Sequence, residues 1–268
     1  MRFKGLAALK RPEGYAVTLA GLPEQIPTAR YAMAKAFKIN ELVRAIHKDS
    51  YEWYGFTIAN RGNPELIVDV GLPKNDQNLS DYTSVGPEMI AGFQESLPRD
   101  QVINGWIHSH GSLPYEQFSL TDERNQVTVL DYVTALLRKP VAKKEVVIRD
   151  LTILVKDRWT EKDLERGSVV LITDAPISEA RVIETIYGGF CYALVIGDGG
   201  WHREEIHYRR RGILSGQTTE DKREADLVLM DIGRQLTGSD MQRLEEEVRV
   251  KIQPGLAVPR ERFEREAT

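Results

Sequence analysis

The sequence predicts a mixed α/β fold with a largely antiparallel sheet flanked by helices. Two observations predict it: segments with apolar residues at helical spacing occur along the chain, and short segments rich in β-branched and aromatic residues lie between them. A third is the tetrapeptide 197–200, Gly-Asp-Gly-Gly, which separates two apolar segments as a hairpin turn does. With 268 residues, the chain has room for one main domain with extensions.

The first half of the chain is predicted to contain two helices and three strands. Prolines interrupt residues 1–30, which favours irregular structure or short strands there. A helix is then expected over 31–49, strands over 51–59 and 65–70 around a turn at 61–64, and a polar loop over 71–83. Ser84 is expected to cap a short helix with Pro87 in its first turn, and a strand follows over 101–108.

The second half begins with a loop over 111–118 and a helix over 121–138, whose apolar face is predicted to contain Val127, Leu130, Val133 and Leu137. Residues 140–166 have the composition of an insertion with one strand, 151–155, and a short charged helix. A buried strand is predicted over 168–173 and a hairpin over 190–196 and 201–208. From 218 onward the sequence is predicted to be helical and charged, with breaks at Gly238 and Pro254.

These elements suggest three segments: an N-terminal extension over 1–30, a main domain over 31–212 with the insertion at about 140–166, and a charged helical C-terminal extension over 213–268. The formal net charge of −4 argues against a nucleic-acid-binding protein. No run of 18 apolar residues occurs, so no membrane partner is expected. The absence of a secretory signal in 1–21 and the single cysteine, Cys191, favour a cytoplasmic protein with no disulfide.

With one cysteine, a metal ion would have to be held by histidines and carboxylates. His108 and His110 are two residues apart at the end of a predicted strand, so their imidazoles share a face. Asp122, at the start of the following helix, is the candidate third ligand. Each pattern has a plainer interpretation: His-x-His is often a surface pair, and Ser119-x-x-Asp122 is also a helix-capping pattern.

The combination of these residues resembles the signature of the JAMM (MPN-plus) metalloproteases, in which a Glu precedes His-x-His and Ser-x-x-Asp. Glu52 matches that Glu, in the segment Y-E-W-Y-G-F-T-I, with Gly55 three residues on. The resemblance covers roughly residues 35–135 and extends more loosely to 209. The family usually has Pro after the second His, where this chain has Gly111, and the spacer 111–118 is one residue longer than the common pattern.

The resemblance implies an MPN/cytidine-deaminase-like fold and a Zn²⁺ ion held by His108, His110 and Asp122. A catalytic zinc of this kind keeps three protein ligands and one open position for water. The resemblance further implies that Glu52 takes the proton of that water and delivers it to the leaving amine. Ser119 would donate a hydrogen bond to the developing oxyanion. The implied activity is that of a zinc metallopeptidase or isopeptidase.

The partner implied by the resemblance is a ubiquitin-like protein or peptide, cut next to its tail, with loop 71–84 and insertion 140–166 as docking segments. Two other interpretations stay open. One is a catalytically inactive scaffold of the same fold that mediates protein–protein interaction. The other is an interaction module that uses the C-terminal helices at 218–250, which are also candidates for forming a homodimer or a complex.

Overall fold

The computed structural model describes residues 17–78, 86–113, 115–147, 151–165, 169–176 and 181–254. The chain divides into two compact units. Of the described residues, those within 22–138, 189–209 and 220–268 form the larger unit, and those within 1–21, 139–188 and 210–219 form the smaller unit. None of the helices in the described part of the chain is both long and apolar enough to cross a membrane.

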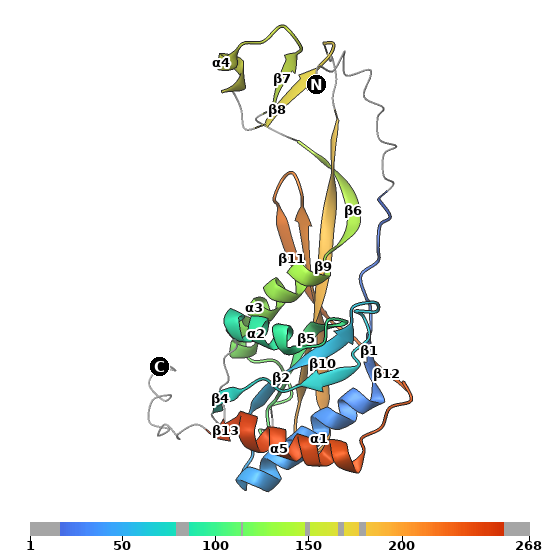
Figure 1. Cartoon of the computed structure of the whole chain (residues 1–268), viewed down its shortest axis with the longest axis vertical. Coiled ribbons are helices and arrows are strands. Elements are labelled where there is room, and N and C mark those ends of the chain that lie inside the picture. Colours follow the sequence, from blue (N-terminus) through green and yellow to red (C-terminus); the bar gives the residue numbers. More distant parts are fainter. Residues whose placement is uncertain are drawn as a thin grey trace. The chain divides into compact units, whose positions relative to one another are not determined.

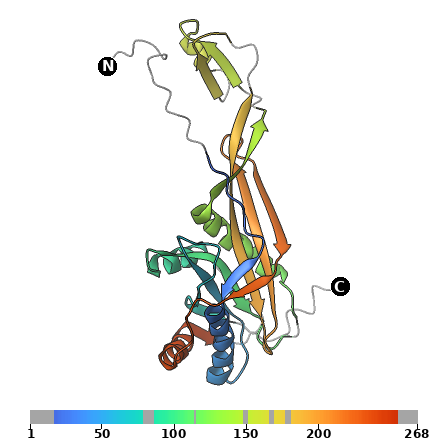
Figure 2. The same ribbon diagram turned by 90° about the vertical axis from the view of Figure 1, so that its right-hand side faces the viewer.

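The larger unit contains most of the elements (Figures 1 and 2). Those that lie wholly within it are β1 (Ile26–Ala29), α1 (Arg30–His47), β2 (Trp53–Asn60), β3 (Asp69–Gly71), β4 (Asn75–Asn78), α2 (Pro87–Ser96), β5 (Gln101–Ser109), α3 (Leu120–Leu137), β12 (Leu227–Met230), α5 (Gly238–Lys251) and β13 (Ile252–Pro254). Three strands have residues in both units: β9 (Val182–Ile196), β10 (His202–Gly212) and β11 (Thr218–Glu224).

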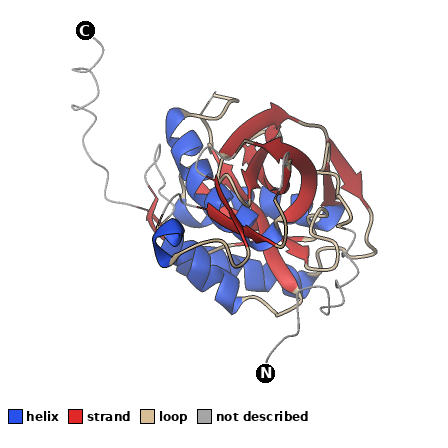
Figure 3. Ribbon diagram, turned by 90° about the horizontal axis from the view of Figure 1, so that it is seen from above, coloured by secondary structure: helices blue, strands red, loops and turns tan. Residues whose placement is uncertain are grey.

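The main sheet has the strand order β11-β10-β9-β5-β2-β3. Strand β2 pairs antiparallel with β3 and β5, whereas β5 pairs parallel with β9. Strand β5 is buried from its second residue to its last, as expected for a central strand covered on both faces. The predicted fold class, a mixed and largely antiparallel sheet flanked by helices, is therefore confirmed. Figure 3 shows the helices in blue and the strands in red.

Helices α1 and α3 cover opposite faces of this sheet. Neighbouring residues of a strand point to opposite faces. Ser109, at the end of β5, bonds to Asn40 of α1, whereas His108 contacts Asp122 of α3. Helix α5 packs beside α1 (Figure 1). The end of β5 is thus enclosed between two helical layers.

The smaller unit contains β6 (Lys139–Val146), β7 (Leu151–Val155), α4 (Glu161–Leu164) and β8 (Val169–Thr173). Strand β6 pairs antiparallel with Val182–Gly188 of β9, and β7 pairs parallel with β8. The strand predicted over 168–173 exists, but the prediction that it is buried is wrong. Leu171 and Ile172 are both exposed, because β8 belongs to a separate two-stranded sheet.

Several predicted elements differ in detail from the observed ones. Only the end of the strand expected over 65–70 is observed, as part of β3. Ile67 instead makes an isolated bridge to Thr28. The loop expected over 71–83 contains β4, which pairs with β13. Ser84 lies outside the described residues, and the N-cap of α2 is Gly86 rather than Ser84.

The predicted apolar face of the helix over 121–138 is also partly wrong. Val127 is 47% exposed, and the buried stripe runs instead through Gln126, Val129, Leu130, Val133 and Leu137. A glutamine occupies a core position because its side-chain amide donates to Cys191 Sγ at 3.4 Å. Burial raises the pKa of Cys191 to about 12, so this residue behaves as a small buried hydrophobe.

The prediction that residues from 218 onward are helical is wrong for the first part of that segment. Residues 218–224 and 227–230 form β11 and β12, and helix α5 begins only at Gly238, after Thr237 as N-cap. Every side chain of β11 is exposed, so the strand has no apolar alternation that the sequence could reveal. Strand β12 is held in place by parallel pairing with β1, which lies about 200 residues earlier in the chain.

Candidate metal centre

The end of β5 carries the two histidines that the sequence singles out. His108 and His110 lie on one face, with Ser109 between them on the other, as the alternation of a strand requires. His110 follows the last residue of β5, and its backbone N–H still donates to the Ile196 carbonyl oxygen of β9 at 2.9 Å. Both imidazoles are buried, at 1% and 3% exposure, so they are not a surface pair.

Asp122 is brought to the histidines by the capping of α3. Ser119 is the N-cap, and its Oγ accepts a hydrogen bond from the Asp122 backbone N–H at 3.2 Å. In return, Oδ2 of Asp122 accepts from the Ser119 backbone N–H at 2.6 Å. This capping box orients the carboxylate toward the end of β5. The capping interpretation of these residues and the ligand interpretation are therefore compatible.

Donor atoms of three residues converge at this point. Nε2 of His108 lies 3.2 Å from Nε2 of His110 and 3.1 Å from Oδ1 of Asp122, and Nε2 of His110 lies 3.3 Å from Oδ2 of Asp122. A tetrahedral zinc ion with ligand bonds of about 2.0–2.1 Å separates two ligand atoms by about 3.3 Å. The chemistry and the spacing of the group both fit a metal ion, and His108, His110 and Asp122 form a group that can hold one.

The hydrogen bonding of His110 leaves Nε2 as the atom that could bind a metal ion. Its Nδ1 lies 2.7 Å from the backbone carbonyl oxygen of Tyr115. A carbonyl oxygen only accepts, so Nδ1 carries the proton and Nε2 is directed at His108 and Asp122. A backbone carbonyl in this position is a common device for orienting a metal-binding histidine.

Burial and charge set the protonation of the group. Burial lowers the pKa of His108 and outweighs the opposing effect of Asp122, so its imidazole is neutral at neutral pH. Burial also acts to lower the pKa of His110, but Asp122, the Tyr115 carbonyl and Glu52 raise it above its ordinary value. Burial acts to raise the pKa of Asp122, yet its hydrogen bonds to both histidines and to Ser119 hold it far below its ordinary value. A carboxylate and a neutral imidazole are the forms that bind metal ions.

Glu52 lies beside this group. Strands β2 and β5 pair Trp53 with Ser109 and Tyr54 with His108, so one further step along both strands brings Glu52 opposite His110. Trp53 donates to Asn40 of α1, which places Glu52 on the opposite side of the sheet, the side of the histidines. The Glu52 side chain is only 9% exposed, and its charge contributes to the raised pKa of His110. It is not part of the three-residue metal-holding group.

Ser119 is half-buried at the start of α3. Its Oγ acts as an acceptor toward the Asp122 backbone N–H, which leaves the hydroxyl hydrogen to donate to another group. The structure therefore brings four predicted site residues, His108, His110, Asp122 and Ser119, directly together, and Glu52 joins them through the sheet register.

Sequence reasoning missed four aromatic residues around the histidines, one of which, Tyr115, stacks on His110 with ring centroids 5.8 Å apart. The Trp106 indole stacks on His108, with ring centroids 4.5 Å apart and an interplanar angle of 15°. Phe118 packs against His108 at 5.8 Å, and Trp201 lies edge-on to His110 at 6.1 Å. Only Trp106 had a signal in the sequence, since it precedes His108 by two residues and so shares its face.

Gly111 stands where the resembled family has a proline, and the turn explains the difference. Its φ of +55° is inaccessible to proline, and an added Cβ would lie 2.4 Å from Ser50 Oγ. Its backbone N–H also donates to Ser109 Oγ at 2.9 Å, a bond that proline cannot make. The turn after His110 therefore requires glycine at position 111.

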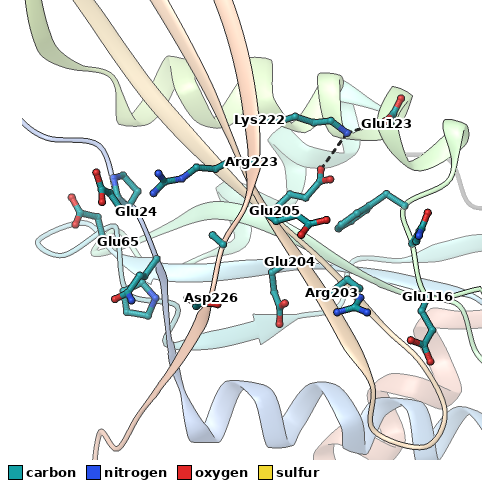
Figure 4. A pocket seen from close by; sticks show the side chains of 17 residues that line it. Glu24, Glu65, Glu116, Glu123, Arg203, Glu204, Glu205, Lys222, Arg223 and Asp226 are labelled. Carbon is teal, nitrogen blue, oxygen red and sulfur yellow. Dashed lines mark hydrogen bonds and ion pairs between the residues drawn. The ribbon is translucent and has the colours of Figure 1, made fainter.

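A cavity of about 1100 Å³ borders the loop between the second histidine and α3 (Figure 4). Its lining includes Phe118, which packs on His108, and Glu123, which follows Asp122 in α3. Lys222 lies between Glu123 and Glu205, at 2.9 and 3.5 Å. The lining has eight carboxylates and three cationic side chains, so negative charge prevails in the cavity.

Neither the models of known protein families nor the curated proteins contain a match to this sequence.

Proposed function

We propose that this protein is a zinc-dependent peptidase or isopeptidase of the JAMM type. The observation that carries the proposal is the buried group of His108, His110 and Asp122 with Glu52 facing it from the neighbouring strand. Two imidazoles and one carboxylate are a ligand set of catalytic zinc sites, and an acid beside the metal that does not bind it is the arrangement that hydrolysis requires. A structural zinc site would have four protein ligands instead.

Zinc held by these three residues would supply a water whose pKa is lowered to about 7 and would polarise the scissile carbonyl. Glu52 would accept a proton from the water that attacks the carbonyl carbon and would deliver it to the amine that leaves when the C–N bond breaks. Ser119 would donate a hydrogen bond from its hydroxyl group to the oxygen that becomes negatively charged. The aromatic residues Trp106 and Phe118 limit the access of solvent to His108, which strengthens these electrostatic effects.

The proposed substrate is a polypeptide with an extended tail, such as that of a ubiquitin-like protein, cut at a peptide or isopeptide bond. The cavity beside Phe118 has room for several residues of such a chain. Of the two docking segments expected from the sequence, the loop over 71–84 lies partly outside the described residues, and the insertion over 140–166 belongs to the smaller unit. Their role remains part of the proposal.

The test is to purify the full chain, measure its metal content by elemental analysis, and assay cleavage of ubiquitin-like fusions and of short peptides. We expect stoichiometric zinc, and hydrolysis that a chelator abolishes and added zinc restores. Zinc without cleavage of any such substrate would support the inactive scaffold instead. Absence of bound metal, under conditions in which zinc is supplied, would contradict the proposal.

Replacing Ser119 by alanine is expected to slow hydrolysis by about 10²–10³-fold, as the loss of one oxyanion-stabilising donor does. The zinc content should stay unchanged, because the backbone N–H of residue 119 still donates to Asp122. Loss of the N-cap should also destabilise the protein by about 1 kcal/mol. Steady-state kinetics, elemental analysis and thermal unfolding measure the three effects.

A matched control is Thr237→Ala, since Thr237 and Asp240 form the same kind of capping box at the start of α5. This variant should lose similar stability but keep its hydrolysis rate. Equal rates for the two variants would mean that Ser119 only caps α3, and zinc loss in Ser119→Ala would assign it a structural role in the metal centre.

A further inference from the structure

A buried amide on α1 lies directly behind the candidate metal centre. Asn40 is 5% exposed, and its Oδ1 accepts two hydrogen bonds, from Trp53 Nε1 at 2.8 Å and from Ser109 Oγ at 2.5 Å. Its Nδ2 donates to Asp198 Oδ1 at 3.0 Å. Asn40 therefore joins three chain segments: the start of β2, the end of β5, and the turn between β9 and β10.

Two of these partners are sequence neighbours of the site residues. Trp53 follows Glu52, and Ser109 stands between His108 and His110. Because side chains alternate along a strand, Trp53 and Ser109 point toward α1 while Glu52 and the histidines point toward α3. One oxygen atom of Asn40 thus holds together the two strands that carry the proposed proton acceptor and two of the proposed metal ligands.

The third partner closes a ring of hydrogen bonds around the turn after His110. Asp198 accepts from Asn40 and from Ser50 Oγ, and its backbone N–H donates to the Gly111 carbonyl oxygen at 2.8 Å. The Gly111 N–H donates in turn to Ser109 Oγ. The ring of Asn40, Ser109, Gly111 and Asp198 leaves the turn little freedom to change the direction of the His110 side chain.

We propose that Asn40 is a positioning residue for the metal centre, through its hydrogen bonds to Trp53, Ser109 and Asp198. This inference rests on the proposed function, because it assumes that His108, His110 and Asp122 bind a metal ion. Asparagine suits the position because it accepts on one side and donates on the other. Partners outside the ligand shell fix ligand orientation, and their replacement typically weakens metal binding by about 10–100-fold.

The test is Asn40→Asp, measured by zinc affinity in competition with a chelator and by the visible absorption spectrum of the Co²⁺-substituted protein. The new carboxylate still accepts from Trp53 and Ser109 but faces the Asp198 carboxylate with no donor between them. We expect zinc binding to weaken by about 10–100-fold and the Co²⁺ spectrum to change, since it reports the coordination geometry.

The double variant Asn40→Asp, Asp198→Asn provides the rescue, because the amide at position 198 donates to the carboxylate at position 40. It should recover most of the zinc affinity and the original Co²⁺ spectrum. Asn104→Asp is the matched control. Asn104 is a fully buried asparagine on β5, the strand that carries His108, and it accepts from Thr57 and donates to the Pro64 carbonyl oxygen. Its replacement should lower the unfolding temperature and leave the Co²⁺ spectrum unchanged.

The positioning role is wrong if Asn40→Asp binds zinc with unchanged affinity and spectrum, if it behaves like Asn104→Asp, or if the double variant recovers nothing. Should Asn40→Asp not fold, Ser109→Ala decides, since it removes two bonds of the ring with a small change in volume. Unchanged zinc affinity in Ser109→Ala overturns the role. A native protein that binds no zinc overturns the proposed function, and this inference with it. If the native protein binds zinc and the variants bind it with unchanged affinity, only this inference is overturned.

Discussion

Replacing Asp122 by asparagine is expected to remove the metal ion while α3 stays intact. The amide has the shape of the carboxylate, and its oxygen can still accept from the Ser119 backbone N–H, so the capping box survives. The negative charge that completes the ligand set is lost. Zinc affinity should fall by more than about 100-fold, because changes outside the ligand shell alone cost about 10–100-fold. Chelator competition measures the affinity, and hydrolysis should fall with it.

The matched control is the next residue of the same helix. Glu123→Gln removes a carboxylate that is exposed and paired with Lys222, so this variant should keep its zinc. Ser119→Ala separates the cap from the ligand, since it removes a capping bond and leaves the Asp122 carboxylate in place. If Asp122→Asn binds zinc as tightly as the native protein, Asp122 is a capping residue only.

The parts of the fold that were predicted correctly are those whose pattern is local. Helix α1 has apolar residues at helical spacing, α3 begins at a Ser-x-x-Asp cap, and the glycines at 199 and 200 adopt the positive φ values that a tight hairpin turn requires. Each of these signals lies within a few residues of the structure it specifies.

Strands β11 and β12 were missed because their stability comes from pairing with other strands, β10 and β1, and not from an apolar pattern of their own. The segment Thr218–Glu224 consists of charged residues and threonines, all exposed, and is held as a strand by its pairing with β10. Composition alone suggests a charged helix there, and only the tertiary pairing decides against it. The same holds for Leu171 and Ile172, whose apolar character suggested burial that the two-stranded sheet β7-β8 does not provide.

The residues of the candidate site likewise fall into those that local spacing identifies and those that only the tertiary structure brings in. His108 and His110 share a face by strand alternation, and Asp122 follows within one loop, so local spacing was enough to group them. Glu52 needed the register between β2 and β5, which joins residues more than 50 positions apart and which only the family resemblance supplied. Asn40 was missed, although a single polar residue among the buried Ala36, Ile39 and Val43 is a signal that a core polar partner exists.

Replacing Glu52 by glutamine is expected to abolish most of the hydrolysis while the metal stays bound. The amide has the size of the carboxylate but accepts no proton at neutral pH, so the general acid–base contribution of about 10²–10⁴-fold is lost. Zinc should remain stoichiometric, because His108, His110 and Asp122 are unchanged and Glu52 is outside that group. Steady-state kinetics with elemental analysis of the same preparation measures both effects.

The division of the loss between kcat and KM distinguishes proton transfer from a role in substrate binding. A group that acts only in the transition state lowers kcat and leaves KM nearly unchanged, whereas a binding group raises KM. We therefore expect the loss in Glu52→Gln to fall on kcat. The control is Glu41→Gln, which removes an exposed carboxylate of α1 that pairs with Lys38 and should change neither constant.

The alternative outcomes for Glu52→Gln have distinct meanings. Full activity would show that another group accepts the proton, and the proposed mechanism would be wrong. Loss of zinc would make Glu52 a ligand or a structural support for His110, whose pKa its charge raises. Retained zinc with a loss confined to kcat is the combination that a proton acceptor beside the metal predicts, because the carboxylate then contributes to the transition state and not to holding the metal ion or the substrate.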